Sequence, residues 1–221
     1  MDASNLGNTI TTCHIALQQS PFRSLLPVYR QQIYRLLGSG AGESGRLRLG
    51  TLALNAAYRV AALWEHARPM DNRLQDVLVA ARSILHEDAD PEVALSQLGA
   101  AADWLSLLFD EQTAWLYESD QRELPPASSS EDSILALRAA LAALQVSVGQ
   151  DYWAGREFFE SSTDSDLEEE EVDAPLWALR AVLGTFELLE ADNQRRLEFW
   201  TWWLSEAVPN AAMRILVRRG T

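Results

Sequence analysis

The stretch W-E-H-A-R-P-M-D-N-R, residues 64–73, places side chains that could do chemistry between two apolar segments. Glu65 and His66 are residue types that serve as general acid and base or as metal ligands. They are adjacent, however, and neighbouring residues on a helix point about 100° apart, so their side chains do not converge on one atom. The zinc-binding pattern His-Glu-x-x-His is also absent, because no second histidine follows at that spacing.

A structural role accounts for the same stretch. Pro69 predicts the end of one helix, because a proline restricts the residue before it. Asp71 is well placed to cap the next helix, since its carboxylate can accept hydrogen bonds from free backbone N–H groups. Arg73 can pair with Asp71, and Trp64 can pack beneath the corner. We therefore interpret this stretch as a helix corner.

Other residues that could bind a metal or phosphate, or act in catalysis, lack partners at useful spacing. The three histidines, His14, His66 and His86, do not share a helix face at metal-ligand spacing. Cys13 beside His14 is only a sequence neighbour, which does not make a nucleophile and base. The glycine-rich stretch 38–45 lacks the preceding strand that a phosphate-binding loop needs. We therefore predict no metal, no cofactor and no enzymatic activity.

The segments around these residues have helical patterns. Apolar residues recur at helical spacing, and alternating runs joined by Asn-Gly or Asp-Gly turns do not occur. We expect helices over about 21–37 with a kink or break at Pro27, 46–67, 71–85, 91–118 and 132–148, then from Pro175, and across 199–204 up to Pro209.

Short connections between these segments predict an all-α fold of packed antiparallel helical hairpins, with about eight helices and an irregular acidic segment over 157–173. We expect one domain over 1–221, which could divide into two helical halves joined near 120–132. Some Ala/Leu-rich segments are loosely alike, and whether they are true repeats stays open.

The cluster Phe199, Trp200, Trp202 and Trp203 has two interpretations. Aromatic residues dominate binding energies at interfaces, so an exposed cluster would be a hot spot. Residues 199, 202 and 203 fall on one helical face, however, which favours packing in the core.

The net charge of −14 argues against direct binding to nucleic acid, which depends on basic surfaces. Residues 157–173 alone hold nine acidic residues and no basic one. Such a run is either a solvated loop or a surface that imitates phosphate groups and attracts a basic partner. The carboxylates that we expect to contact a partner are Asp164, Asp166, Glu168, Glu169, Glu170, Glu171 and Asp173.

The cysteine content and the apolar patterning suggest a compartment. The single cysteine excludes an intramolecular disulfide, and no basic start with an apolar run marks a secretory signal. No apolar stretch is long enough to span a bilayer. We therefore expect a cytoplasmic protein without a membrane partner.

The corner and the Ala-rich helix after it resemble a segment of immunity proteins from bacterial polymorphic-toxin systems, in the all-helical family numbered fifth. The resemblance covers about 30 residues of 221, and Leu74 stands where members usually have proline. It implies a small cytoplasmic protein that binds and neutralises a toxin domain and has no catalysis of its own. The matching residues are Trp64, Glu65, Pro69, Asp71 and Arg73, followed by Ala80, Ala81 and Arg82.

The resemblance and the acidic segment together predict an immunity protein that occludes its cognate toxin stoichiometrically. The toxin would be basic, since toxin domains that attack nucleic acid are commonly basic around their active sites. Two alternatives are a helical scaffold or adaptor and, less favoured, an enzyme that binds a small ligand or metal between helices. The sequence does not indicate the toxin's activity or the oligomeric state.

Overall fold

The computed structural model describes residues 3–38, 42–86, 131–149, 156–168, 171–185 and 192–214, and single positions at 92, 93, 96, 99, 100, 103 and 153. Within these residues there is no strand, which confirms the all-α prediction. Of the predicted helix over 91–118, only residues 92, 93, 96, 99, 100 and 103 are described, and all six are helical. Most of the predicted link near 120–132 lies outside the described residues.

Where they are described, the connections between consecutive helices are short, except for the one that contains the acidic segment, between Ser147 and Ala174. A short 3-10 turn, Asp164–Asp166, interrupts the acidic segment, and a π-helical turn, Trp203–Ala207, precedes the last helix. The helices are α1 (Ala3–Gln19), α2 (Pro27–Gly38), α3 (Glu43–Ala67), α4 (Arg73–Leu85), α6 (Glu131–Ser147), α7 (Ala174–Leu183), α8 (Asn193–Trp202) and α9 (Val208–Ala212).

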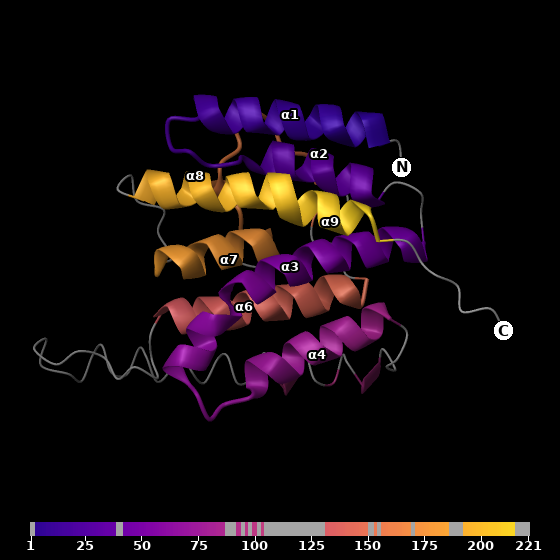
Figure 1. The fold of residues 1–221 in the computed structure, drawn as a ribbon, viewed down its shortest axis with the longest axis vertical. Helices are drawn as coiled ribbons and strands as arrows, with labels where there is room; N and C mark the ends of the chain where they lie inside the picture. The colour runs from indigo at the N-terminus through magenta and orange to yellow at the C-terminus, as the bar shows by residue number, and fades with distance from the viewer. Residues whose placement is uncertain are drawn as a thin grey trace, which may run out of the picture.

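The helices lie roughly side by side, from α1 at the top of Figure 1 to α4 at the bottom. α3 and α6 occupy the centre, where α3 packs against α6, α4, α7 and α2. α6 is apolar around most of its circumference, and every residue from Ser133 to Leu144 except Arg138 is buried. A helix with this pattern is stable only inside a core, and its many alanines let neighbouring helices approach closely.

The N-terminal region differs from its prediction. The helix expected over 21–37 begins only at Pro27, which suits a first helical position because the missing N–H has no partner there. Residues 20–26 form a non-helical connection, and the preceding helix α1 was not predicted. Leu6, Cys13 and Leu17 are buried on one side of α1, a helical spacing that could have revealed it.

The C-terminal region continues through Pro209, which was predicted to interrupt the helix. The π-helical turn widens the backbone just before α9, so the proline ring is accommodated near the start of a new helix. Phe199, Trp200 and Trp203 are buried, which confirms core packing for most of the aromatic cluster. Trp202 is partly exposed, and the Arg59 guanidinium lies 4.8 Å from its ring centroid.

None of the described helices has the length and hydropathy needed to cross a bilayer.

The contact between the end of α2 and the start of α3 generates a prediction. A Cβ at Gly45 would lie 2.9 Å from the Gly38 carbonyl oxygen, a backbone atom that cannot easily move. We expect Gly45→Ala to lower the free energy of unfolding by about 1–2 kcal/mol, measured by urea denaturation. Gly7→Ala is the matched control, because nothing lies within 4 Å of its new Cβ in α1. It should raise stability by up to about 1 kcal/mol, and equal effects of the two substitutions would contradict the steric argument.

Candidate functional site

The corner between α3 and α4 is held by the residues of the sequence motif. Trp64 is fully buried, and its indole N–H donates to the Asp71 carbonyl oxygen at 2.9 Å. The Arg68 guanidinium lies over the Trp64 ring, 4.9 Å from its centroid. The N-cap position of α4 is occupied by Asn72, not by Asp71 as predicted, and Asn72 makes no side-chain capping bond. Asp71, one residue earlier, accepts a hydrogen bond at 3.0 Å from the N–H of Arg73, the first residue of α4.

The rest of the motif adds contacts within the chain. Arg73 Nε lies 3.1 Å from Asp71 Oδ1, and Glu65 accepts a hydrogen bond from Gln75. Pro69 is exposed just after the end of α3. In the described part of the chain, no three potential metal ligands lie close enough to hold an ion. These contacts fit a structural corner better than a site of chemistry.

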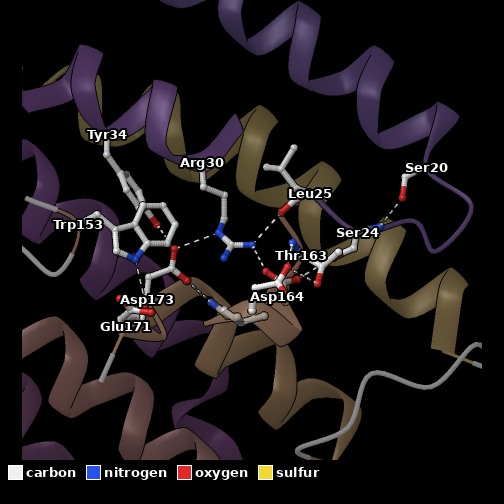
Figure 2. Close-up of polar contacts among 12 residues, drawn as sticks. Ser20, Ser24, Leu25, Arg30, Tyr34, Trp153, Thr163, Asp164, Glu171 and Asp173 are labelled. Atoms are coloured by element: carbon white, nitrogen blue, oxygen red, sulfur yellow. Dashed lines mark hydrogen bonds and ion pairs between the residues drawn. The ribbon is translucent and has the colours of Figure 1, made fainter. Parts of the chain in front are cut away.

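The acidic segment is anchored to α2 by a buried arginine. Arg30 is fully buried, and its guanidinium binds two carboxylates that belong to the acidic segment (Figure 2). Arg30 Nη1 lies 2.7 Å from Asp164 Oδ1, and Nε lies 3.0 Å from Asp173 Oδ2. Asp164 and Asp173 are only 6% and 5% exposed. Their carboxylates therefore face inward, and we do not include them in a partner-binding surface.

Each of these carboxylates has further hydrogen bonds that replace lost water. The Ser24 hydroxyl donates to Asp164 Oδ2 at 3.0 Å, and the Tyr34 hydroxyl donates to Asp173 Oδ2 at 2.6 Å. The other oxygen of Asp173 accepts the Leu176 N–H at 3.0 Å and so caps α7. A buried charge is stable only when it is paired and hydrogen-bonded. Both carboxylates and two of the three guanidinium nitrogens of Arg30 meet that condition, and Nη2 has no hydrogen-bond partner among the described residues.

Aromatic rings enclose the same guanidinium. The ring centroids of Trp153 and Trp200 lie 5.3 Å and 5.2 Å from the Arg30 guanidinium carbon. The Trp153 indole N–H donates to the Glu171 carbonyl oxygen at 2.9 Å, which ties the ring to the acidic segment. Burial disfavours the charge of Arg30, but the two aspartates more than offset this and hold its pKa above the usual range. Burial, aided by Asp173, raises the pKa of Tyr34.

The residues of the acidic segment that face outward are also held in place, by hydrogen bonds and an ion pair. Asp166 is exposed, and its carboxylate accepts the Thr163 N–H and hydroxyl at 2.7 Å and 3.0 Å, which lowers the pKa of Asp166. Glu168 is exposed, and its N–H donates to Glu171 Oε2 at 3.0 Å. Glu171 also forms an ion pair with Arg156. Glu169 and Glu170, also predicted to contact a partner, lie outside the described residues.

An exposed aromatic side chain lies in the same segment. Phe159 is 66% exposed, and the exposed acidic residues Glu157 and Glu160 flank it in sequence. None of these three was among the predicted contact residues, although Glu157 and Glu160 belong to the acidic run. Their exposure makes them additional candidates for contact with a partner.

The anchoring residues Ser24, Arg30 and Tyr34 were not predicted. One signal in the sequence could have identified Arg30, because it lies three and seven residues before Ile33 and Leu37, on the buried stripe of α2. A charged residue at such a position requires a buried partner. The sequence does not show which of the nine acidic residues of 157–173 supplies it.

The anchor predicts a large loss of stability when its cation is removed. We expect Arg30→Met to lower the free energy of unfolding by about 3–5 kcal/mol, because two buried carboxylates would lose their partner. Urea denaturation measures this, with Arg82→Met on the exposed side of α4 as the control. Adding Asp164→Asn and Asp173→Asn should recover part of the loss. Equal effects of Arg30→Met and Arg82→Met would contradict the buried anchor.

A second prediction concerns alkaline pH. Burial raises the pKa of Cys13 from 9.0 to about 12, and burial raises that of Tyr34 above 10.0. Above about pH 10 the unfolded chain therefore binds fewer protons than the folded one, and each group lowers stability by about 1.4 kcal/mol per pH unit. No lysine contributes, because the chain has none.

Tyr34→Phe should make the fall in stability above about pH 10 less steep, because the side chain at this position would then have no proton to lose. Urea denaturation at several alkaline pH values measures the slope, and the slope is independent of any constant loss caused by the missing hydroxyl. A slope that is the same in both proteins would show that Tyr34 does not keep its proton in the folded state.

Comparison with known proteins places this architecture in a family. No curated protein matches the chain. The model of the family described as immunity protein Imm5 matches residues 10–210. The match includes the α3–α4 corner, the Arg30 anchor and the acidic segment, and it spans most of the 221 residues. The chain therefore belongs to the immunity protein family Imm5.

Proposed function

We propose that the protein binds a cognate bacterial toxin and neutralises it stoichiometrically in the cytoplasm, without catalysis of its own. The observation that carries this proposal is the family match over residues 10–210. The single cysteine suits a reducing compartment. Neutralisation by occlusion requires a surface that is complementary to the toxin and is ordered before the toxin arrives.

The outward side of the acidic segment is the surface that we propose for this contact. Asp166 and Glu168 are exposed, and Glu171 is partly exposed beside Arg156. We keep Glu169 and Glu170 in the proposed surface because of their charge and their position in the run. Arg30 restrains the segment from beneath through Asp164 and Asp173. An ordered loop loses less conformational entropy on binding than a mobile loop does, which favours affinity.

The charge of this surface favours a basic toxin. The carboxylates could occupy a groove that normally accepts phosphate groups, and they would steer a basic domain into fast association. The net charge of −14 disfavours both nucleic acid and an anionic membrane surface as partners. We therefore propose a toxin domain whose active site is positively charged.

Affinity capture tests the proposed function most directly. The tagged protein would be recovered at low ionic strength from its own cells while toxin production is induced. We expect one basic polypeptide at a stoichiometric ratio, released by salt, and we expect the purified protein to abolish that polypeptide's toxicity. Several unrelated partners, or one partner whose toxicity is unchanged by the complex, would contradict neutralisation and favour an adaptor.

Neutralising the acidic run tests the surface. We expect the triple variant Glu168→Gln, Glu169→Gln and Glu170→Gln to slow association with the captured toxin by about tenfold or more at low ionic strength. The salt dependence of the rate should also weaken. Stopped-flow fluorescence measures both quantities.

The matched control removes three exposed carboxylates from other elements, by Asp76→Asn, Glu198→Gln and Glu206→Gln. This variant has the same net charge as the first, so the comparison separates a local contact from the overall charge. If both variants slow association equally, the acidic segment has no special place in the interface.

A further inference from the structure

A cavity of about 550 Å³ lies beside the anchor, between the second half of α2, the start of α3, the end of α6 and the start of α7. Tyr34, Trp153 and Asp173, which lie close to one another in the anchor (Figure 2), are among its lining residues. This volume is within the range of pockets that hold small molecules in other proteins. The toxin contact proposed above does not use this cavity.

Two arginines give the cavity a positive charge. Arg35 is exposed at the rim, and it makes no hydrogen bond or ion pair with any described residue. Arg46 is held in place, because its Nη1 donates to the carbonyl oxygens of Ser147 at 2.8 Å and of Ile84 at 3.4 Å. The only acidic side chain among the described lining residues is Asp173, which shares the Arg30 cation with Asp164, so these three groups together carry one negative charge. Among the described lining residues, the two positive charges of Arg35 and Arg46 exceed it, in a protein with a net charge of −14.

The rest of the lining is apolar and includes an immobilised ring. Leu49, Leu52 and Val146 line the cavity together with Trp153. The Trp153 ring is tilted against Tyr34 with 5.1 Å between centroids, and its N–H is bound to the Glu171 carbonyl oxygen. Trp153 is buried and also packs against the Arg30 guanidinium, so only a small part of its ring faces the cavity. Together with the aliphatic walls it favours a flat apolar group, which can pack against these side chains and displace water.

The same positive region includes the first turn of α3. Gly42 precedes this helix without a side-chain cap, and both Gly42 and Gly45 line the cavity. The dipole of this helix therefore adds to the charge of the two arginines at this end of the cavity, and Glu43, an exposed residue of the same turn that is not among the described lining residues, partly offsets it.

We propose that this cavity is a binding site for a small molecule that joins an anionic group, a carboxylate or a phosphate, to a planar apolar body. Arg35 and Arg46 would bind the anionic group, and Trp153, Leu49 and Leu52 would contact the planar body. This site is additional to the toxin-binding surface and does not depend on it.

Calorimetric titration of the full chain with two probes tests the site. Adenosine monophosphate presents a phosphate and indole-3-acetate presents a carboxylate, each joined to a planar ring. Adenosine and inorganic phosphate, titrated separately, present the two halves of the first probe. We expect at least one intact probe to bind. If adenosine monophosphate binds, it should bind at least tenfold more tightly than adenosine or inorganic phosphate alone.

Three variants connect this binding to the cavity. Arg35→Gln should weaken binding about tenfold with an unchanged melting temperature, because Arg35 has no partner in the described part of the chain. Arg82→Gln on α4 is the matched control, an exposed arginine outside the cavity, and it should leave binding unchanged. Leu49→Trp should fill the apolar part and abolish binding of the intact probe.

Three results would overturn the proposal. The first is that neither intact probe binds the wild-type protein. The second is that Arg35→Gln and Arg82→Gln weaken binding equally, which would indicate only a general charge effect. The third is that Leu49→Trp, with its fold verified by circular dichroism, still binds the probe as the wild type does. Failure to capture a toxin would leave all three results unaffected, so the two proposals can fail separately.

Discussion

The structure depends on the need to pair one fully buried guanidinium. Arg30 lies on the inner face of α2, and removing such a cation from water costs several kcal/mol unless carboxylates and hydrogen bonds replace the solvent. The replacements come from Asp164 and Asp173, more than 130 positions away in sequence. Because Asp173 also caps α7, the same contacts fix the acidic segment and the start of the next helix. The segment is thereby bound to α2, through Arg30 and Tyr34, and to the connection before α2, through Ser24.

Because of this constraint, the carboxylates of the acidic segment fall into two groups. Asp164 and Asp173 face inward and stabilise the fold, whereas Asp166 and Glu168 face solvent and are available to a partner. The inward pair holds the backbone that carries the outward pair. In the function that we propose, a loop that is ordered in advance would occlude a toxin's active site at a lower entropic cost. The neighbouring cavity uses Tyr34, Trp153 and Asp173 as a wall.

Local pattern predicted much of the helical architecture, and the long-range contacts were not predictable from it. The expected helices over 46–67 and 132–148 correspond to α3, Glu43–Ala67, and α6, Glu131–Ser147, because their apolar stripes are regular. The motif from Trp64 to Arg73 correctly indicated the family, and its residues make the contacts of a helix corner. The inward direction of Asp164 could not be read from a run of acidic residues, since its partner lies in another helix. Likewise, no local pattern in the sequence shows that Arg35 and Arg46 line one cavity.

Hydrogen–deuterium exchange across the acidic segment tests the central claim most directly. If Arg30 holds this segment, the amides of Asp166 and Leu176, which donate to Thr163 and Asp173, should be protected in the wild-type protein. In Arg30→Met, under conditions where the protein remains folded, their exchange should accelerate strongly, while the amides of α4 should change much less. Rapid exchange of these amides in the wild type, or equal acceleration throughout the protein in the variant, would contradict the account.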